Sequence, residues 1–198
     1  MRISAIVLAS GLSRRMGTDK LHMKIKGRNL YEYILTTLCR VPFYERIVVA
    51  KDEDILSRAE SLGFLAVRNT KFYLGKSESI KAGLRSAKET DGFMFFVADQ
   101  PFLHVETIRK LCRAFCENPS RIIQPAYNGI PGNPVIFPAV FLPQLMDLNG
   151  DRGGKAVLEK NKGKVIRVDI PSDLESVDID TMEDYERARH IGPPGAIE

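Results

Sequence analysis

The sequence lacks the features that direct a chain into or across a membrane. No apolar run approaches the ~18 residues that a membrane-spanning helix requires. Met1, Arg2 and Ile3 run directly into the first predicted strand, so we predict no signal peptide. Together these absences predict a cytoplasmic protein. The 198 residues also contain no internal repeat, and they suffice for one well-buried domain but not for two ordinary ones.

Residue types with reactive side chains are also scarce. The three cysteines, Cys39, Cys112 and Cys116, are too few for a disulfide framework. Cys112 and Cys116 share a face of a predicted helix, but no further metal ligands accompany them, so we expect buried, reduced thiols. The three histidines fall on no motif, and we interpret them as surface or packing residues: His22, His104 and His190.

Charge is unevenly distributed, although the net charge of +4 and the pI of about 9.0 are mild. Residues 11–30 hold six Lys/Arg and one Asp, whereas residues 169–186 hold eight Asp/Glu and no Lys/Arg. A nucleic-acid binder more often shows a continuous basic face. A local basic loop with a separate acidic segment instead favours a site for a triphosphate and Mg²⁺, with no nucleic-acid or membrane partner.

Apolar and amphipathic stretches alternate along the chain. Strands are predicted at residues 3–8, 46–50, 64–67, 93–98, 121–124, 134–137 and 164–169. Amphipathic helices are predicted near residues 30–40, 55–62, 80–87, 105–115 and 181–191, with Gly63 ending the second. This alternation predicts an α/β fold, a single doubly wound, mostly parallel sheet with helices on both faces. We expect one domain at residues 1–191 and a flexible tail at 192–198.

The loop after the first strand is the strongest candidate for a phosphate site. Gly11 and Gly17 flank a serine and two arginines, and Lys20 follows. Glycines let backbone N–H groups approach a ligand, and the cations supply positive charge. Five residues separate the glycines, so the P-loop spacing is absent, as is the dinucleotide fingerprint. The alternative is a basic surface loop after an edge strand.

Carboxylates and serines mark further candidates, each with a structural alternative. Asp99 follows the apolar run at 93–97, where open α/β sheets bind ligands, but it could simply cap a turn. Asp178 and Asp180 would lie on one side of an extended segment; Asp180 could equally be a helix N-cap, with Glu183 completing a capping box. Ser77 and Ser79 stand at the start of a predicted helix, which they could cap.

Several motifs together resemble those of the MobA-like nucleotidyltransferases, which attach a nucleotide to the phosphate of molybdopterin or of other small metabolites. The first loop matches at Leu8, Ala9, Gly11, Ser13, Arg15, Met16, Gly17 and Lys20. The resemblance extends to about residue 188. It implies a Rossmann variant of the nucleotide-diphospho-sugar transferase type, with the nucleotide in the amino-terminal half and the acceptor in the carboxyl-terminal half.

The resemblance also implies roles for individual residues. Arg15, Lys20 and Asp99 would be catalytic, and Asp99, Asp180 and Asp178 would hold Mg²⁺, with Mn²⁺ as the alternative. The implied nucleotide-binding residues are Leu8, Ala9, Ser10, Gly11, Ser13, Arg15, Lys20, Gly75, Ser77 and Ser79. The implied acceptor-binding residues are Gln100, Gly129, Gly132, Asn133, Asp151 and Lys155. Asn133 and Lys155 replace the His and Arg that are usual in the family.

The implied reaction joins CMP from CTP to molybdopterin and releases pyrophosphate. Asp99-Gln100-Pro101 is the form associated with cytidylyl transfer, and Ser10 and Thr18 stand where the guanylyl-transferring branch usually has glycine. The alternatives are GTP as donor, another phosphorylated acceptor, or a non-catalytic protein that carries the finished cofactor to a molybdenum hydroxylase.

Overall fold

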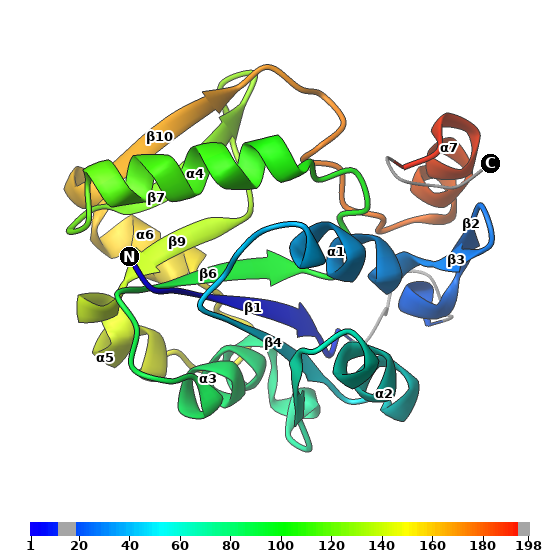
Figure 1. Cartoon of the computed structure of the whole chain (residues 1–198), viewed down its shortest axis with the longest axis horizontal. Coiled ribbons are helices and arrows are strands. Elements are labelled where there is room, and N and C mark those ends of the chain that lie inside the picture. The colour runs from blue at the N-terminus through cyan, green and yellow to red at the C-terminus, as the bar shows by residue number, and fades with distance from the viewer. Residues whose placement is uncertain (12–18, 194–198) are drawn as a thin grey trace.

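The computed structural model describes residues 1–11 and 19–193. One sheet of eight strands forms its centre, and a two-stranded sheet lies beside it (Figure 1). The strands of the large sheet are β1 (Ile3–Ala9), β4 (Glu45–Ala50), β5 (Leu65–Arg68), β6 (Gly92–Val97), β7 (Ile122–Tyr127), β8 (Ile130–Pro131), β9 (Val135–Pro138) and β10 (Val165–Ile170). The small sheet pairs β2 (Lys24–Ile25) with β3 (Arg28–Asn29).

The large sheet is mostly parallel, as predicted. Its order is β10-β7-β9-β6-β1-β4-β5, with β8 paired to β7. β1 lies between β4 and β6 and pairs with both in parallel, so Val7 stands beside Val48 on one side and Phe96 on the other. β9 is antiparallel to both β6 and β7, and β10 is again parallel to β7. The carboxyl ends of β1, β4 and β6 therefore meet at one edge of the sheet.

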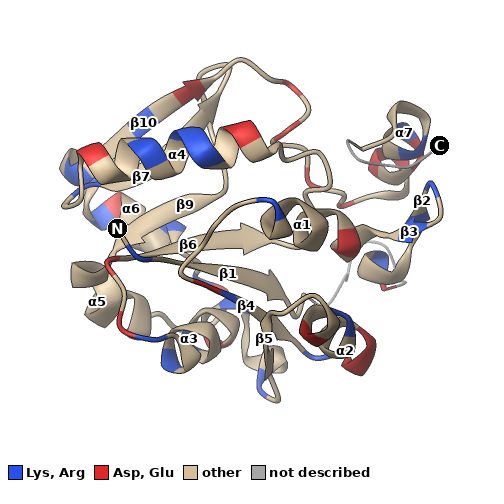
Figure 2. Ribbon diagram, viewed as in Figure 1, with Lys and Arg blue, Asp and Glu red and all other residues tan. Residues whose placement is uncertain are grey.

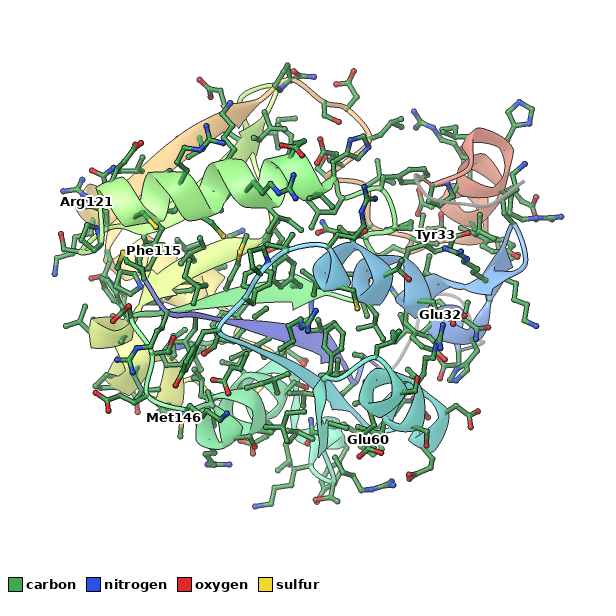
Figure 3. All side chains as sticks on the ribbon, in the orientation of Figure 1. Glu32, Tyr33, Glu60, Phe115, Arg121 and Met146 are labelled. Atoms are coloured by element: carbon green, nitrogen blue, oxygen red, sulfur yellow. The ribbon has the colours of Figure 1, made fainter. Side chains whose placement is uncertain are left out.

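Helices cover both faces, which also matches the prediction. α1 (Leu30–Cys39), α2 (Glu53–Ser61), α4 (Val105–Glu117) and α7 (Met182–Ile191) contribute to one hydrophobic cluster. α3 (Lys76–Ser86), α5 (Leu142–Met146) and α6 (Lys155–Lys160) contribute to the other. Strand residues alternate between the two clusters: Ala5 and Val7 belong to the first, and Ile6 to the second. Tyr33 and Phe115, labelled in Figure 3, are buried in the first cluster.

The element boundaries depart from prediction in several places. α3 begins at Lys76, before the predicted start at residue 80, and the five-residue α5 was not predicted. Gly63 has φ +77° just after Leu62, the C-cap of α2, so it ends that helix as expected. The expectation of three buried thiols is wrong: Cys39 and Cys116 are exposed, and only Cys112 is partly buried. Cys112 and Cys116 lie four residues apart in α4, and this spacing does not prevent the Cys116 side chain from being exposed to solvent. None of the described helices is long and apolar enough to cross a bilayer.

We predict that Gly83→Ala destabilises the fold. Gly83 lies in α3 where that helix crosses β1 and β4, and an added Cβ would lie 2.6 Å from Cγ2 of Ile6 and 3.2 Å from Cγ2 of Val49. Alanine favours a helix by about 1 kcal/mol, but overpacking a buried contact costs about 1–3 kcal/mol. We therefore expect a net loss of about 1 kcal/mol in the free energy of unfolding, measured by urea denaturation.

Gly163→Ala is the matched control, because a Cβ at Gly163 would meet no atom within 4 Å. Its unfolding midpoint should stay close to that of the wild type. A Gly83→Ala protein as stable as the wild type would contradict the close contact between α3 and β1.

Candidate functional site

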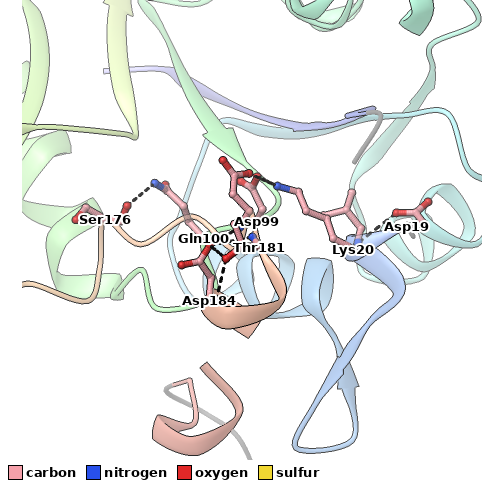
Figure 4. A network of polar contacts seen from close by, with 9 residues as sticks. Asp19, Lys20, Asp99, Gln100, Ser176, Thr181 and Asp184 are labelled. Carbon is pink, nitrogen blue, oxygen red and sulfur yellow. Dashed lines mark hydrogen bonds and ion pairs between the residues drawn. The ribbon is translucent and has the colours of Figure 1, made fainter. Parts of the chain in front are cut away.

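Three charged side chains from distant parts of the chain meet at the carboxyl edge of the sheet. The ammonium nitrogen of Lys20 lies 2.6 Å from Oδ2 of Asp99 and 2.7 Å from Oδ1 of Asp180. Figure 4 shows Lys20 reaching toward Asp99. Burial alone would lower the pKa of Lys20, but attraction to the two carboxylates outweighs it, and the pKa is raised above its usual 10.5. Lys20 is therefore positively charged throughout the physiological range.

Backbone hydrogen bonds fix the two carboxylates relative to the sheet. Asp99 follows β6, and the N–H of the preceding Ala98 donates to the carbonyl oxygen of Leu8 at 3.3 Å, which joins the ends of β6 and β1. The N–H of Ile179 donates to the carbonyl oxygen of Asp99 at 3.0 Å. Since Ile179 is fully buried, it anchors the segment that carries Asp178 and Asp180. Acidic residues mark this segment between β10 and α7 in Figure 2.

Asp180 is not the cap of the last helix, so that structural alternative is wrong. Thr181 is the N-cap of α7, and its hydroxyl accepts a hydrogen bond from the N–H of Asp184 at 3.1 Å. Asp184, rather than Glu183, completes the capping box by accepting from the N–H of Thr181 at 2.9 Å. The hydrogen bond from the Thr181 side chain lowers the pKa of Asp184. The carboxylate of Asp180 is thereby left to point toward Lys20.

Asp178 lies beside the same cluster. Burial, followed by repulsion from Asp99, raises its pKa to about 6. Gln100, which also donates from Nε2 to the carbonyl oxygen of Ser176 at 3.4 Å, counters this by a hydrogen bond to the Asp178 side chain. Lys20 and the three carboxylates Asp99, Asp178 and Asp180 thus form one electrostatic unit.

The donor atoms of this unit fit a hard divalent cation. Oδ1 of Asp99 is buried and has no hydrogen-bond partner among the described residues. In residues 1–11 and 19–193, no three carboxylate, imidazole or thiol side chains are arranged to surround a metal ion. Mg²⁺ usually takes one or two protein carboxylates and completes its shell with phosphate oxygens and water. The site matches that pattern better than a cage built from protein ligands alone.

A smaller cavity of about 390 Å³ opens beside the cluster. It is lined by six of the residues expected to bind nucleotide and by Asp99; the six are Leu8, Ser10, Gly11, Lys20, Gly75 and Ser79. Among the described residues, no atom lies within 4 Å of a Cβ built at Gly11. The expected residues Ser13, Arg15 and Thr18 lie outside the described residues.

A larger cavity of about 970 Å³ adjoins the smaller one. Four residues, Leu8, Lys76, Val97 and Asp151, line both. Four of the six expected acceptor residues line the larger cavity: Gly132, Asn133, Asp151 and Lys155. The hydroxyl of Tyr127 donates to the carbonyl oxygen of Asn133 at 2.6 Å and so fixes the rim at that point.

Other expected site residues lie elsewhere. Gln100 is buried against the segment at 176–178, and Gly129 lies after β7 with φ +85°; neither lines the larger cavity. Ser77 and Ser79 do not cap α3, whose N-cap is Gly75. Ser79 instead accepts a hydrogen bond from Nδ2 of Asn69 at 3.0 Å, and the Ser77 hydroxyl is buried.

The residues of the smaller cavity that the sequence reasoning missed include three close to Gly75. Phe72 and Tyr73 belong to a short 3-10 helix, and Lys76 is the first residue of α3. All three stand close to the Gly75 motif, so their position in the chain was the available signal. Their side chains were not singled out, because a lysine or an aromatic residue next to a glycine is not in itself a binding motif. Only the fold shows that these side chains line a cavity.

Comparison with known sequences identifies the family of the chain. The profile of the MobA-like NTP transferase domain matches residues 5–165. The chain belongs to this family.

The relatives of the chain in this family carry several names. It is 27% identical to the purine catabolism protein PucB of Bacillus subtilis, over 93% of this chain and 94% of PucB. It is 26% identical to the molybdenum cofactor cytidylyltransferase of Escherichia coli, over 94% and 95% of the two chains. A probable molybdenum cofactor guanylyltransferase of Natranaerobius thermophilus is 30% identical, over 64% of this chain and 62% of the relative.

Solved structures share the fold of this MobA-like domain. The Rv0371c homologue from Mycobacterium sp. strain JC1 superposes with a TM-score of 0.82 at 24% identity, covering 96% of this chain and 98% of the homologue. A manganese complex of Rv0371c from Mycobacterium tuberculosis superposes with a TM-score of 0.77 at 21% identity, covering 96% and 99%. At these identities the likeness shows the fold.

We predict that Asp178 makes the stability of the MobA-like domain depend on pH. Its pKa is raised to about 6 in the folded chain, so the neutral carboxyl group favours folding at low pH. That contribution is complete below the unfolded value and is lost as the pH rises through about 6. Asp178→Asn should remove this loss, so the variant should lose less stability than the wild type between acidic and neutral pH.

The measurement is urea unfolding across this pH range in buffer with a chelator. Asp169→Asn, a change at an exposed position of β10, is the control and should retain the wild-type pH dependence. If the stability of Asp178→Asn depends on pH in the same way as that of the wild type, the pKa of this carboxyl group is not raised by its surroundings.

Proposed function

We propose that this protein transfers CMP from CTP to the phosphate of molybdopterin and releases pyrophosphate. The observation that carries the proposal is the cluster of Lys20, Asp99 and Asp180, which opens onto a nucleotide-sized cavity that adjoins a larger one. A transferase needs its two substrates side by side, with charge stabilisation where they meet. Family membership and the name of the Escherichia coli relative support the same reaction.

In this proposal, the first loop and Lys20 bind the triphosphate. The open backbone at Gly11 lets phosphate oxygens approach closely, and Lys20 supplies a fixed positive charge next to them. Ser13 and Arg15 would add a hydroxyl donor and a two-pronged guanidinium. Asp99 and Asp180 would hold Mg²⁺, with Asp178 beside them. Mg²⁺, when bound, would neutralise negative charge on the phosphates. The manganese complex of a structural neighbour supports Mn²⁺ as an alternative.

The reaction needs little acid–base chemistry from the protein. An oxygen of the acceptor phosphate, already anionic at neutral pH, forms a bond to the α-phosphorus of CTP. The bond from the α-phosphorus to the bridging oxygen breaks, and pyrophosphate leaves with that electron pair. Catalysis would then consist of positioning and charge stabilisation. His22 is consistent with this: its ring lies 3.4 Å from Asp19 and 5.8 Å from the Tyr31 ring, and it lines neither cavity.

The choice of CTP over GTP rests on the first loop and on Asp99-Gln100-Pro101. Ser10 is buried, and its hydroxyl donates to the carbonyl oxygen of Val49 at 3.2 Å. This side-chain hydrogen bond joins the end of β1 to β4, and glycine, which has no side chain, cannot form it. Because relatives named as cytidylyltransferase and guanylyltransferase have similar identities, GTP is the alternative donor.

We also propose where in the cell the protein acts and which protein receives its product. Nucleoside triphosphates and Mg²⁺ are abundant in the cytoplasm, and the three cysteines are free thiols, so we place the protein there. Residues 1–191 would form the catalytic domain and 192–198 a tail. An apo molybdenum hydroxylase would be the recipient of the product.

We predict that pyrophosphate is released from CTP, Mg²⁺ and molybdopterin, and that Asp99→Asn lowers this rate by at least ~100-fold, because it removes a charge where the reaction needs it. The measurement is a coupled pyrophosphate assay with each of the four nucleoside triphosphates. Glu117→Gln changes an exposed carboxylate at the end of α4, bordering neither cavity, and should keep the wild-type rate.

Release of pyrophosphate from GTP alone would support the same mechanism and contradict the choice of cytosine as the base. Nucleotide binding without release from any triphosphate would contradict molybdopterin as acceptor and favour the carrier alternative.

A further inference from the structure

The larger cavity crosses most of the sheet. Its lining includes side chains from β1, β6, β9, β7 and β10, which are consecutive strands in the sheet. Figure 1 shows β1 and β10 on opposite sides of β6 and β9. Four strand spacings of ~4.8 Å separate β1 from β10, a span of about 19 Å. A cavity of this extent suits an elongated molecule better than a single phosphate.

Four basic side chains line this cavity: Lys76, Lys155, Lys162 and Arg167. In the described part of the chain, none of the four has a carboxylate within ion-pairing distance. Other basic residues are paired, such as Arg58 with Glu32 at 2.9 Å and Arg109 with Glu106 at 2.7 Å. Asp151 and Glu159 also line the cavity, so its lining keeps a positive excess of two.

The basic residues are placed at both ends of the cavity. Lys76 lies where the two cavities adjoin. The close approach of two loops fixes this end: the N–H of Ser77 donates to the carbonyl oxygen of Gly150 at 3.0 Å, and a Cβ at Gly75 would lie 2.4 Å from the Gly150 carbonyl carbon. Arg167 stands on the edge strand β10, beside Gln124 of β7, and Lys162 is three residues before β10.

Apolar side chains form the floor between these ends. Phe95 and Phe137 are in edge-to-face contact, with ring centroids 6.0 Å apart, and Val135 lies next to them in the same cluster. All three line the cavity, together with Ile80 and Leu158. The floor offers van der Waals contact to a weakly polar body, and charge-assisted hydrogen bonds are available at either end.

We propose that this enzyme, besides the acceptor named above, also takes an elongated acceptor molecule with an anionic group at each end. Its reacting phosphate lies by Lys76, beside the α-phosphate of the bound nucleotide. Its second anionic group is held by Lys162 and Arg167, and its body rests on Phe95, Phe137 and Val135. This inference rests on the proposed function for the identity of the reacting end, and it adds a substrate class: acceptors with two separated anions.

Binding of simple probes tests this without turnover. Octanediol bisphosphate carries an anion at each end of a flexible apolar chain, and octanediol monophosphate lacks the second anion. By isothermal titration calorimetry, the wild type should bind the bisphosphate about tenfold more tightly, since two charge-assisted contacts contribute on that order. In Lys162→Gln/Arg167→Gln, this preference should vanish while the affinity for the monophosphate stays unchanged.

Lys160→Gln/Arg113→Gln is the matched control. It removes the same charge from exposed positions on α6 and α4 that line neither cavity, and it should keep the preference. Equal affinity of the wild type for both probes would overturn the inference, as would a preference that survives in Lys162→Gln/Arg167→Gln. Pyrophosphate release without a bisphosphate preference would leave the proposed function standing and remove this inference alone. A preference for the bisphosphate without release of pyrophosphate from any nucleotide would support this inference and contradict the proposed function.

Discussion

The ion cluster formed by Lys20, Asp99 and Asp180 is the constraint on which the site depends. Lys20 lies 79 residues from Asp99 and 160 from Asp180 along the chain, so the cluster exists only in the folded protein. Each of its members is partly removed from water, and removal of one partner would leave a poorly solvated charge. The contacts are therefore a weak argument for stability. They also hold three charges beside the smaller cavity, where the proposed reaction would need them.

The topology of the sheet explains how the cluster forms. β1 and β6 are parallel neighbours, so the loops that follow them leave at the same edge and bring Lys20 and Asp99 together. The antiparallel strand β9 then extends the sheet on the far side of β6, and it carries the floor of the larger cavity. The helices α3, α5 and α6 share one face, where their loops divide the space into two adjoining cavities. In the proposed reaction, this one edge of the sheet would serve both ligands.

Much of this was predictable from sequence, for identifiable reasons. The apolar run before Asp99 and the basic loop after the first strand indicate strand ends without any knowledge of the fold. The errors arise where local chemistry is ambiguous. Ser77, Thr181 and Asp180 are all good N-caps, and tertiary contacts determine that Thr181 caps α7 while Asp180 turns to Lys20. The positions of Gln100 and Lys76 were equally hidden. Gln100 contacts Ser176, and Ser77, the residue after Lys76, contacts Gly150, and both of these partners are more than 70 residues away along the chain.

The two cavities differ in whether their basic side chains are paired with carboxylates. Lys20 in the smaller cavity is paired, whereas Lys155, Lys162 and Arg167 in the larger one are not paired within the described residues, and this difference fits what each cavity would bind. In the smaller cavity, Lys20 is accompanied by carboxylates, so the site keeps negative charge for a divalent cation that accompanies a triphosphate. In the larger cavity, the basic residues have no carboxylate partner within residues 1–11 and 19–193, so their charge would be available to a metal-free anion. An anion bound there would meet Lys76 before the carboxylates of Asp99 and Asp180. Under the proposed function, the fold would therefore separate a substrate bound with a divalent cation from one bound directly by basic side chains.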